Sequence, residues 1–312
     1  SSAISSGDFQ DPFIRGTVDR MNQALAGRME IEYFGRGEIL PGAEEDWDGV
    51  IKGTVEAVMQ PFAYVMHLFP QASLLYGMSG GLTVTQQLMW YQVGGGKELA
   101  NRMLEPVDIV YVARGYGRPG EIFGHFKKPL VTLDDVKGIK MRTAGEGGEV
   151  LKLIGMEPVW LPYPEVYEAM QRGVLDACET GSPALNWTLG YQEVADYLYI
   201  SASRQPVDSG SLIVNGEVWR ETPDDIKVII AAIAEEGALF QYASTIAGDT
   251  IALQQFIDYG TVVAPLPKVI EDEFLAKALE YYDGKAAGDP FYAELVQSQR
   301  DWKKIMEQWS IQ

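Results

Sequence analysis

Two charged side chains in the stretch 138–180, Arg142 and Glu179, each follow a short apolar strand pattern. The planar guanidinium of an arginine offers two parallel N–H donors that suit a carboxylate. The glycine-rich segment after Arg142 (TAGEGG) allows backbone N–H groups to approach a ligand, and the helix expected over 146–153 directs its N-terminus to the same place. Burying Glu179 without a partner is unfavourable, so a cation or hydrogen-bond donors should lie nearby. These residues predict a site for a small anionic ligand.

Both side chains also have a plainer interpretation. Arg142 can pair with an acid at the surface, because such pairs are common and contribute little. Glu179 can be the solvated end of a strand, since glutamate is rarely fully buried. The local sequence leaves both alternatives open.

The overall charge limits which classes of ligand or macromolecule the protein can bind. The 312 residues contain 25 Lys and Arg against 44 Asp and Glu, a formal net charge of −19. This field repels phosphate backbones and anionic lipid, which argues against nucleic-acid or membrane-surface binding. An anionic ligand must therefore be bound by local positive groups.

Scarce residue types exclude further classes of site. The single cysteine, Cys178, allows no intrachain disulfide. Only two histidines are present, His67 and His125, which removes most metal-histidine and Ser-His-Asp mechanisms. No apolar run reaches the roughly 18 residues of a membrane span, so no direct membrane insertion is expected. The first ten residues lack the pattern of a signal peptide, so the protein is either cytosolic or has lost a leader.

The elements that must position the charged pair alternate between helix and strand, which predicts an α/β layered fold. The expected strands cover 29–35, 107–117, 139–142 and 174–179, and the expected helices cover 44–58, 82–104 with a break at Gly94–Gly96, 146–153 and 164–173. The segment 222–260 has a threonine cap, a proline at the first position and helical periodicity almost throughout. Such a helix is about 50 Å long and can serve two lobes as a common spine.

Five blocks together resemble the solute-binding proteins of TRAP (tripartite ATP-independent periplasmic) transporters, and more narrowly the branch that binds 2-oxo acids and related monocarboxylates. They are EIEYFGRGEILPG, LTVTQQLMWYQVGGGKELANRM, LVTLDDVKGIKMR, the run from Gly155 to Glu179, and SLIVNGEVWRETPDD with the long helix after it. They follow the order of the family and cover most of the chain.

The resemblance implies roles for particular residues. The arginine after the G-x-K-x-R strand, here Arg142, binds the ligand carboxylate. A sodium or calcium ion is held by a residue upstream of it, which falls on Glu121 in place of a glutamine, and by the glutamate of LDA-x-E, which is Glu179. The backbone carbonyl of the next residue also binds the ion, and Thr180 stands there in place of tryptophan. A further acidic ligand falls near Gln205 or Asp208.

The resemblance also implies a two-lobed, periplasmic-binding-protein (clamshell) fold with a long helix spanning both lobes. Lobe 1 is expected to comprise 1–124 plus 212–255, and lobe 2 to comprise 125–211 plus 256–312. The rest of the ligand site is expected to be lined by Tyr64, Trp90, Tyr116 and Asp208.

The leading hypothesis is an extracytoplasmic, periplasmic solute-binding protein, with its leader removed, that captures a 2-oxo or 2-hydroxy carboxylate and delivers it to membrane permease subunits. It is not expected to be an enzyme, and a homodimer is left open. One alternative is a metal-assisted enzyme that processes a carboxylate through Glu121 and Glu179. Another is a ligand-binding sensor with the same fold.

Overall fold

The computed structural model describes residues 11–35 and 37–308, which form two compact units. The chain passes between the units several times. The lobe boundaries expected from the sequence stay a prediction. The first unit contains the described residues up to Tyr76, Trp90–Arg118 and Ser209–Ser244, and the second contains Gly77–Met89, Pro119–Asp208 and the described residues from Thr245 onward.

The first unit is built on a three-stranded sheet of order β1-β8-β2, in which β1 and β8 are antiparallel. Its core joins this sheet to α1 and to the first part of α10 through Val18, Val112, Leu212 and Ile230. Its elements are α1 (Asp11–Ala24), α2 (Ala43–Ile51), β1 (Ala57–Gln60), η1 (Phe62–Val65), α3 (Ala72–Tyr76), α5 (Gly96–Leu104), η2 (Glu105–Val107), β2 (Ile109–Arg118), β8 (Asp208–Asn215) and α9 (Gly216–Glu221).

The second unit is built on a six-stranded mixed sheet of order β5-β4-β6-β3-β7-β9. Strand β4 is parallel to both β5 and β6, whereas β3 is antiparallel to β6 and β7. Its elements are β3 (Gly124–Phe126), β4 (Lys140–Arg142), α6 (Glu146–Leu153), β5 (Glu157–Val159), α7 (Tyr163–Gln171), β6 (Ala177–Cys178), α8 (Pro183–Thr188), η3 (Tyr191–Glu193), β7 (Tyr197–Ile200), β9 (Val262–Pro265), α11 (Lys268–Ala286) and α12 (Pro290–Gln308).

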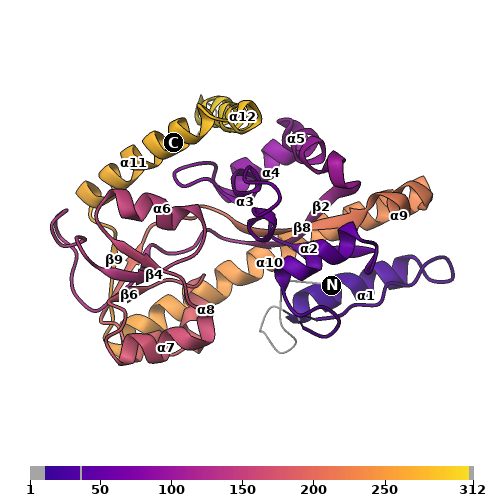
Figure 1. The fold of residues 1–312 in the computed structure, drawn as a ribbon. Coiled ribbons are helices and arrows are strands. Elements are labelled where there is room, and N and C mark those ends of the chain that lie inside the picture. Colours follow the sequence, from indigo (N-terminus) through magenta and orange to yellow (C-terminus); the bar gives the residue numbers. More distant parts are fainter. Residues whose placement is uncertain (1–10, 36, 309–312) are drawn as a thin grey trace. The chain divides into compact units, whose positions relative to one another are not determined.

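Two helices contribute residues to both units: α4 (Val84–Val93) and α10 (Asp224–Tyr259). Helix α10 is one continuous helix of 36 residues, drawn in orange in Figure 1. The predicted α/β fold with a long helix is therefore confirmed. Within the described ranges, no helix combines the length and apolar content needed to cross a bilayer.

Several elements around the expected site form where the sequence predicts them. Strand β4 and helix α6 occupy 140–142 and 146–153. The break between α4 and α5 falls at the predicted glycines, where Gly95 has φ +88°, a conformation that side-chain-bearing residues rarely adopt.

The expected strand at 29–35 is wrong, because these residues pair with no strand in the described part of the chain. The side-chain amide of Asn22 instead donates to the carbonyl of Ile31 and accepts from its N–H, at 2.9 and 2.7 Å. The side chain of Asn22 therefore forms the backbone hydrogen bonds that a neighbouring strand would otherwise form.

The helix expected over 44–58 is too long, since α2 ends at Ile51 and β1 begins at Ala57. Val58 lies opposite Ile213 in the sheet and is almost fully buried. Pairing and burial in the sheet thus decide the conformation of a segment whose periodicity is ambiguous.

Helix α6, which follows the glycine-rich turn, is anchored by Glu146 in its first turn. This buried carboxylate accepts from the hydroxyl groups of Tyr281 and Tyr292, at 3.2 and 3.3 Å, and Lys285 lies 3.4 Å away. These partners come from α11 and α12, and α6 packs against α11 in the second unit (Figure 1). The turn between β4 and α6 is thereby held at its helical end.

The fully buried His125 on β3 is part of the core of the second unit. Its ring packs against Tyr191 and Phe256, with centroids 5.4 and 5.2 Å away. Neither ring nitrogen has a hydrogen-bond partner among the described residues. Burial lowers the pKa of His125 to about 3, so the ring stays neutral in the folded state.

This histidine should make stability depend on pH. The unfolded chain binds a proton near pH 6.5 while the folded chain does not, so stability is lost as pH falls below that value. Between pH 7 and 5 the wild type should lose about 2 kcal/mol more unfolding free energy than His125→Phe, as measured by urea denaturation. Identical losses in the two proteins would contradict this assignment.

Candidate functional site

Arg142 and Glu179 lie side by side at the carboxyl edge of the second unit's sheet. Arg142 ends β4 and is in register with Cys178, the last residue of the parallel strand β6. The N–H of Glu179 donates to the carbonyl of Arg142 at 3.1 Å. In open α/β sheets this edge is where ligands bind.

The guanidinium of Arg142 is fixed by main-chain carbonyls. Its Nε donates to the carbonyl of Leu161 at 2.9 Å, and its Nη1 donates to the carbonyl of Glu179 at 2.6 Å. In the described part of the chain these are its only hydrogen bonds, which leaves Nη2 to donate to a ligand. Its nearest carboxylate, that of Glu179, lies 3.8 Å from Nη1 and is itself buried, so the alternative of a surface ion pair is wrong.

The carboxylate of Glu179 is 1% exposed, which excludes the alternative of a solvated strand end. Its Oε1 accepts from the N–H of Ala144, in the glycine-rich turn, at 3.1 Å. Its Oε2 lies 2.8 Å from Nη2 of Arg204. Burial works against the charged form, but Arg204 and Arg142 outweigh it, so the pKa of Glu179 lies below its usual value.

Arg204 was missed by the sequence reasoning, although it adjoins Gln205, where a further acidic ligand was sought. Its guanidinium is 1% exposed and forms ion pairs with both Glu121 and Glu179. Its Nη1 also lies 3.5 Å from the hydroxyl of Thr143. The sequence carries no local signal for its role, because packing over α6 brings it to the site.

Glu121 is brought to the same place by the loop between β2 and β3, and its N–H donates to the carbonyl of Gln205 at 2.9 Å. Its carboxyl group contacts Arg204. Burial, followed by the negative charge of Glu179, raises the pKa of Glu121 to about 8 against the opposing charge of Arg204. Glu179 is therefore the carboxylate that balances the two arginines at neutral pH.

The other predicted residues of the second unit lie beside this group. The hydroxyl of Thr180 donates to the side-chain oxygen of Asn186 at 2.7 Å, and Asn186 is fully buried. The amide of Gln205 donates to the carbonyl of Val207 at 2.6 Å. Asp208 is buried, and its negative charge adds to the raised pKa of Glu121.

Three predicted lining residues belong to the first unit. Trp90 and Tyr116 are fully buried, and the ring of Trp90 packs against that of Tyr91 with centroids 5.1 Å apart. Tyr64, in η1, is 37% exposed. Their contact with a ligand stays a prediction.

The residues expected to bind a cation do not form a coordination site for one. Glu121 and Glu179 both direct a carboxylate oxygen at the same nitrogen of Arg204. In residues 11–35 and 37–308 there is no group of three or more His, Cys, Asp or Glu side chains that could hold a metal ion. Sodium and calcium prefer several oxygen ligands, so this arrangement fits a guanidinium better than an ion.

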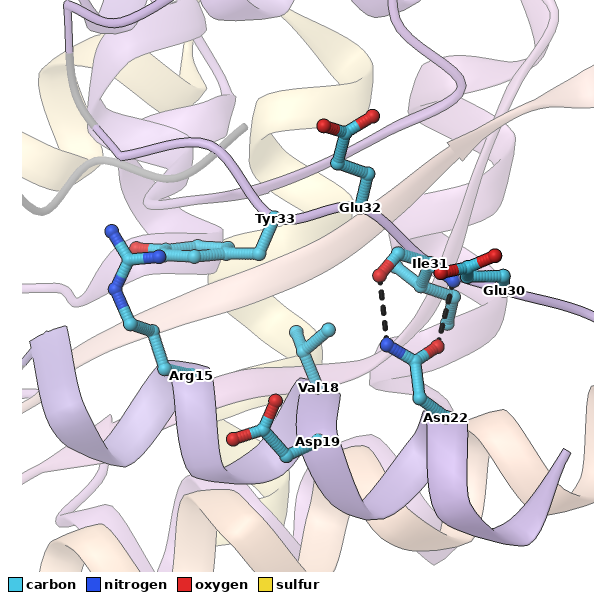
Figure 2. A pocket seen from close by; sticks show the side chains of 8 residues that line it. All are labelled: Arg15, Val18, Asp19, Asn22, Glu30, Ile31, Glu32 and Tyr33. Atoms are coloured by element: carbon cyan, nitrogen blue, oxygen red, sulfur yellow. Dashed lines mark hydrogen bonds between the residues drawn. The ribbon is translucent and has the colours of Figure 1, made fainter. Parts of the chain in front are cut away.

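A separate hollow of about 580 Å³ lies in the first unit, between α1 and the segment 30–33 (Figure 2). Arg15 stacks on Tyr33 there and pairs with Asp11. The other charged residues that line the hollow are carboxylates. An anionic ligand is therefore disfavoured there. The lining residues are Arg15, Val18, Asp19, Asn22, Glu30, Ile31, Glu32 and Tyr33.

The sequence of this chain matches a known family and a curated relative. Residues 13–289 match the model of the family described as bacterial extracellular solute-binding protein, family 7. A curated relative, the monocarboxylate 2-oxoacid-binding periplasmic protein of Nostoc sp., is 26% identical over 291 residues, which are 93% of this chain and 79% of the relative.

Two solved structures share the fold. One is a TRAP transporter solute-binding protein from Bordetella bronchiseptica with copurified calcium and picolinate bound, described as a mixed-occupancy dimer. It has a TM-score of 0.90 and 23% identity, covering 99% of this chain and 92% of that chain. The other, a TRAP periplasmic solute-binding protein from Pseudoalteromonas atlantica with bound sodium and pyruvate, has a TM-score of 0.88 and 23% identity, covering 99% and 94%.

Removing the charge of Glu179 should destabilise the fold. Glu179→Gln keeps an oxygen for the N–H of Ala144 but leaves the buried Arg142 without a carboxylate and Arg204 with Glu121 alone, so the unfolding free energy should fall by roughly 3 kcal/mol. Chemical denaturation at pH 7 measures this loss.

Glu168→Gln is the matched control, because Glu168 pairs with Arg172 at 3.3 Å where both side chains are mostly exposed. Such pairs contribute little, so no measurable change is expected. Equal losses in the two variants would contradict the buried network around Glu179.

Proposed function

The chain belongs to family 7 of the bacterial extracellular solute-binding proteins, and from this membership and the geometry of Arg142 we propose that it captures a small organic acid, a 2-oxo or 2-hydroxy carboxylate. The family match and the similar structures confirm the resemblance to TRAP transporter solute-binding proteins. The family consists of binding proteins for transport, so we propose that the acid is released unchanged to membrane permease subunits, from the periplasm.

The observation that carries the proposal is the way Arg142 is held. Two main-chain carbonyls fix its orientation at the carboxyl edge of the sheet, and Nη2 is left to donate to a ligand. A guanidinium in this state provides a directed, charge-assisted hydrogen bond to a carboxylate. Little rotamer freedom is then lost when the ligand binds.

The substrate class is supported by what similar proteins bind. The Nostoc relative is named for monocarboxylate 2-oxo acids, and the structures hold pyruvate with sodium and picolinate with calcium. Each of these ligands has a second acceptor, an oxo oxygen or a ring nitrogen, adjacent to its carboxylate. The calcium and sodium ions are those of the similar structures, and a homodimer is proposed for this chain from the dimer of one of them.

Replacing Arg142 should abolish most of the affinity. In isothermal titration calorimetry against pyruvate, 2-oxobutyrate, lactate and acetate, we expect the wild type to bind a 2-oxo or 2-hydroxy acid more tightly than acetate. Arg142→Ala should bind that acid about 30-fold or more weakly, because it removes a buried charged partner. Arg142→Lys keeps the charge without the planar fork and should fall between the two.

Arg172→Ala is the matched control, since Arg172 is an exposed arginine just after α7. It should bind like the wild type, and circular dichroism should show all variants folded. Unchanged affinity in Arg142→Ala would refute the role of Arg142. A wild type that binds none of the acids would refute the substrate class, and turnover of a bound acid seen by proton NMR would refute a transport-only role.

A further inference from the structure

One nitrogen atom lies where a bridging cation would be expected. Nη2 of Arg204 is 2.8 Å from Oε2 of Glu179 and also contacts Oε2 of Glu121. These are the two carboxylates to which the family resemblance assigns a metal ion. A positive group placed between the buried Glu179 and the partly buried Glu121 has the electrostatic role that a sodium or calcium ion would otherwise have.

The guanidinium is held in this place from several sides. Its Nη1 reaches the hydroxyl of Thr143, and its Nη2 reaches the carbonyl of Ile122, both at 3.5 Å. The main-chain carbonyl of Arg204 accepts from the hydroxyl of Ser79 at 2.7 Å. These contacts make Arg204 part of a fixed, buried structure within the second unit, unlike a mobile surface residue.

The aliphatic stem of Arg204 passes directly over α6. A Cβ added at Gly147, in the first turn of this helix, would lie 2.8 Å from Cγ of Arg204. Glycine at this position therefore leaves the space that the arginine side chain occupies. The packing of the aliphatic stem and the ion pairs of the guanidinium therefore hold Arg204 in the same position.

The side chains of two further residues expected near a metal ion direct their polar groups to other partners. Thr180 directs its hydroxyl to Asn186, and Gln205 directs its amide nitrogen to Val207. Calcium requires six to eight oxygen ligands at about 2.3–2.6 Å, and sodium also favours a shell of oxygens. The two carboxylates that would begin such a shell both face a hydrogen-bond donor.

We infer that Arg204 is a built-in replacement for the metal ion, so that this protein binds its organic acid without calcium or sodium. The inference deepens the proposed function and rests on it for the identity of the ligand. The acid then meets two guanidinium groups, Arg142 and Arg204, which flank Glu179. Both donate hydrogen bonds, whereas a metal ion accepts lone pairs.

Metal binding itself provides the first test and needs no organic acid. Purified wild type, dialysed against EDTA and then calcium chloride, should carry no stoichiometric calcium by elemental analysis, and calcium should not raise its melting temperature. Arg204→Met keeps most of the side-chain volume but frees both carboxylates, so it should gain calcium binding and a calcium-dependent rise in melting temperature. Adding Glu179→Gln to Arg204→Met should abolish this gain.

Ligand binding provides the second test. Titration of the wild type with pyruvate, in choline chloride with EDTA and again in sodium or calcium chloride, should give affinities equal within about twofold. Arg172→Met serves as the control for loss of a surface arginine. The inference is overturned if wild type retains stoichiometric calcium, or if removal of sodium and calcium weakens pyruvate binding about tenfold or more with recovery when either is restored.

The two proposals fail in different ways. If no organic acid binds in any salt, the proposed substrate class fails, while the calcium measurements still decide the role of Arg204. If Arg204→Met does not fold, the wild-type calcium content decides, and Arg204→Lys, which retains a cation, should resist calcium binding as the wild type does. Stoichiometric calcium in Arg204→Lys and in the wild type alike would refute the inference.

Discussion

The second unit depends on the compensation of one buried negative charge, that of Glu179. An isolated ionised carboxylate costs several kcal/mol to bury, so its partners must be close and well directed. Arg142 and the N–H of Ala144 supply them from the end of β4, and Arg204 from the loop after β7. The end of β6, the turn after β4 and the loop after β7 are thereby tied to a single carboxylate.

This local balance explains how an acidic protein can hold an acid. The net charge of −19 is spread over the chain, and exposed charges are screened beyond a Debye length of about 8–10 Å at physiological ionic strength. Two buried arginines act at much shorter range and in a lower dielectric. The raised pKa of Glu121 further reduces the negative charge around them.

The sequence predicted those parts of the fold whose signals are local. Caps, turn residues and periodicity located β4, α6 and α10, and the proximity of Arg142 and Glu179 followed from two strands that end beside turns. The strand at 29–35 failed because Asn22 satisfies its backbone, and α2 was overextended because pairing with β8 takes Val58 into a sheet. Arg204 could not be placed, because it reaches the site through long-range packing over α6 that no local pattern encodes.

Glu179 holds both arginines with different chemical groups: its main-chain carbonyl accepts from Arg142, and its carboxylate accepts from Arg204. A substitution at position 179 can therefore remove the second contact while keeping the first, because every residue retains a carbonyl. The hydrogen bond from Arg142 to this carbonyl therefore does not depend on which side chain stands at 179, whereas the position of Arg204 depends on the acids at 121 and 179. Loss of Arg204 alone would therefore leave an uncompensated carboxylate at position 179, and only another cation there or a neutral side chain at 179 would restore the balance.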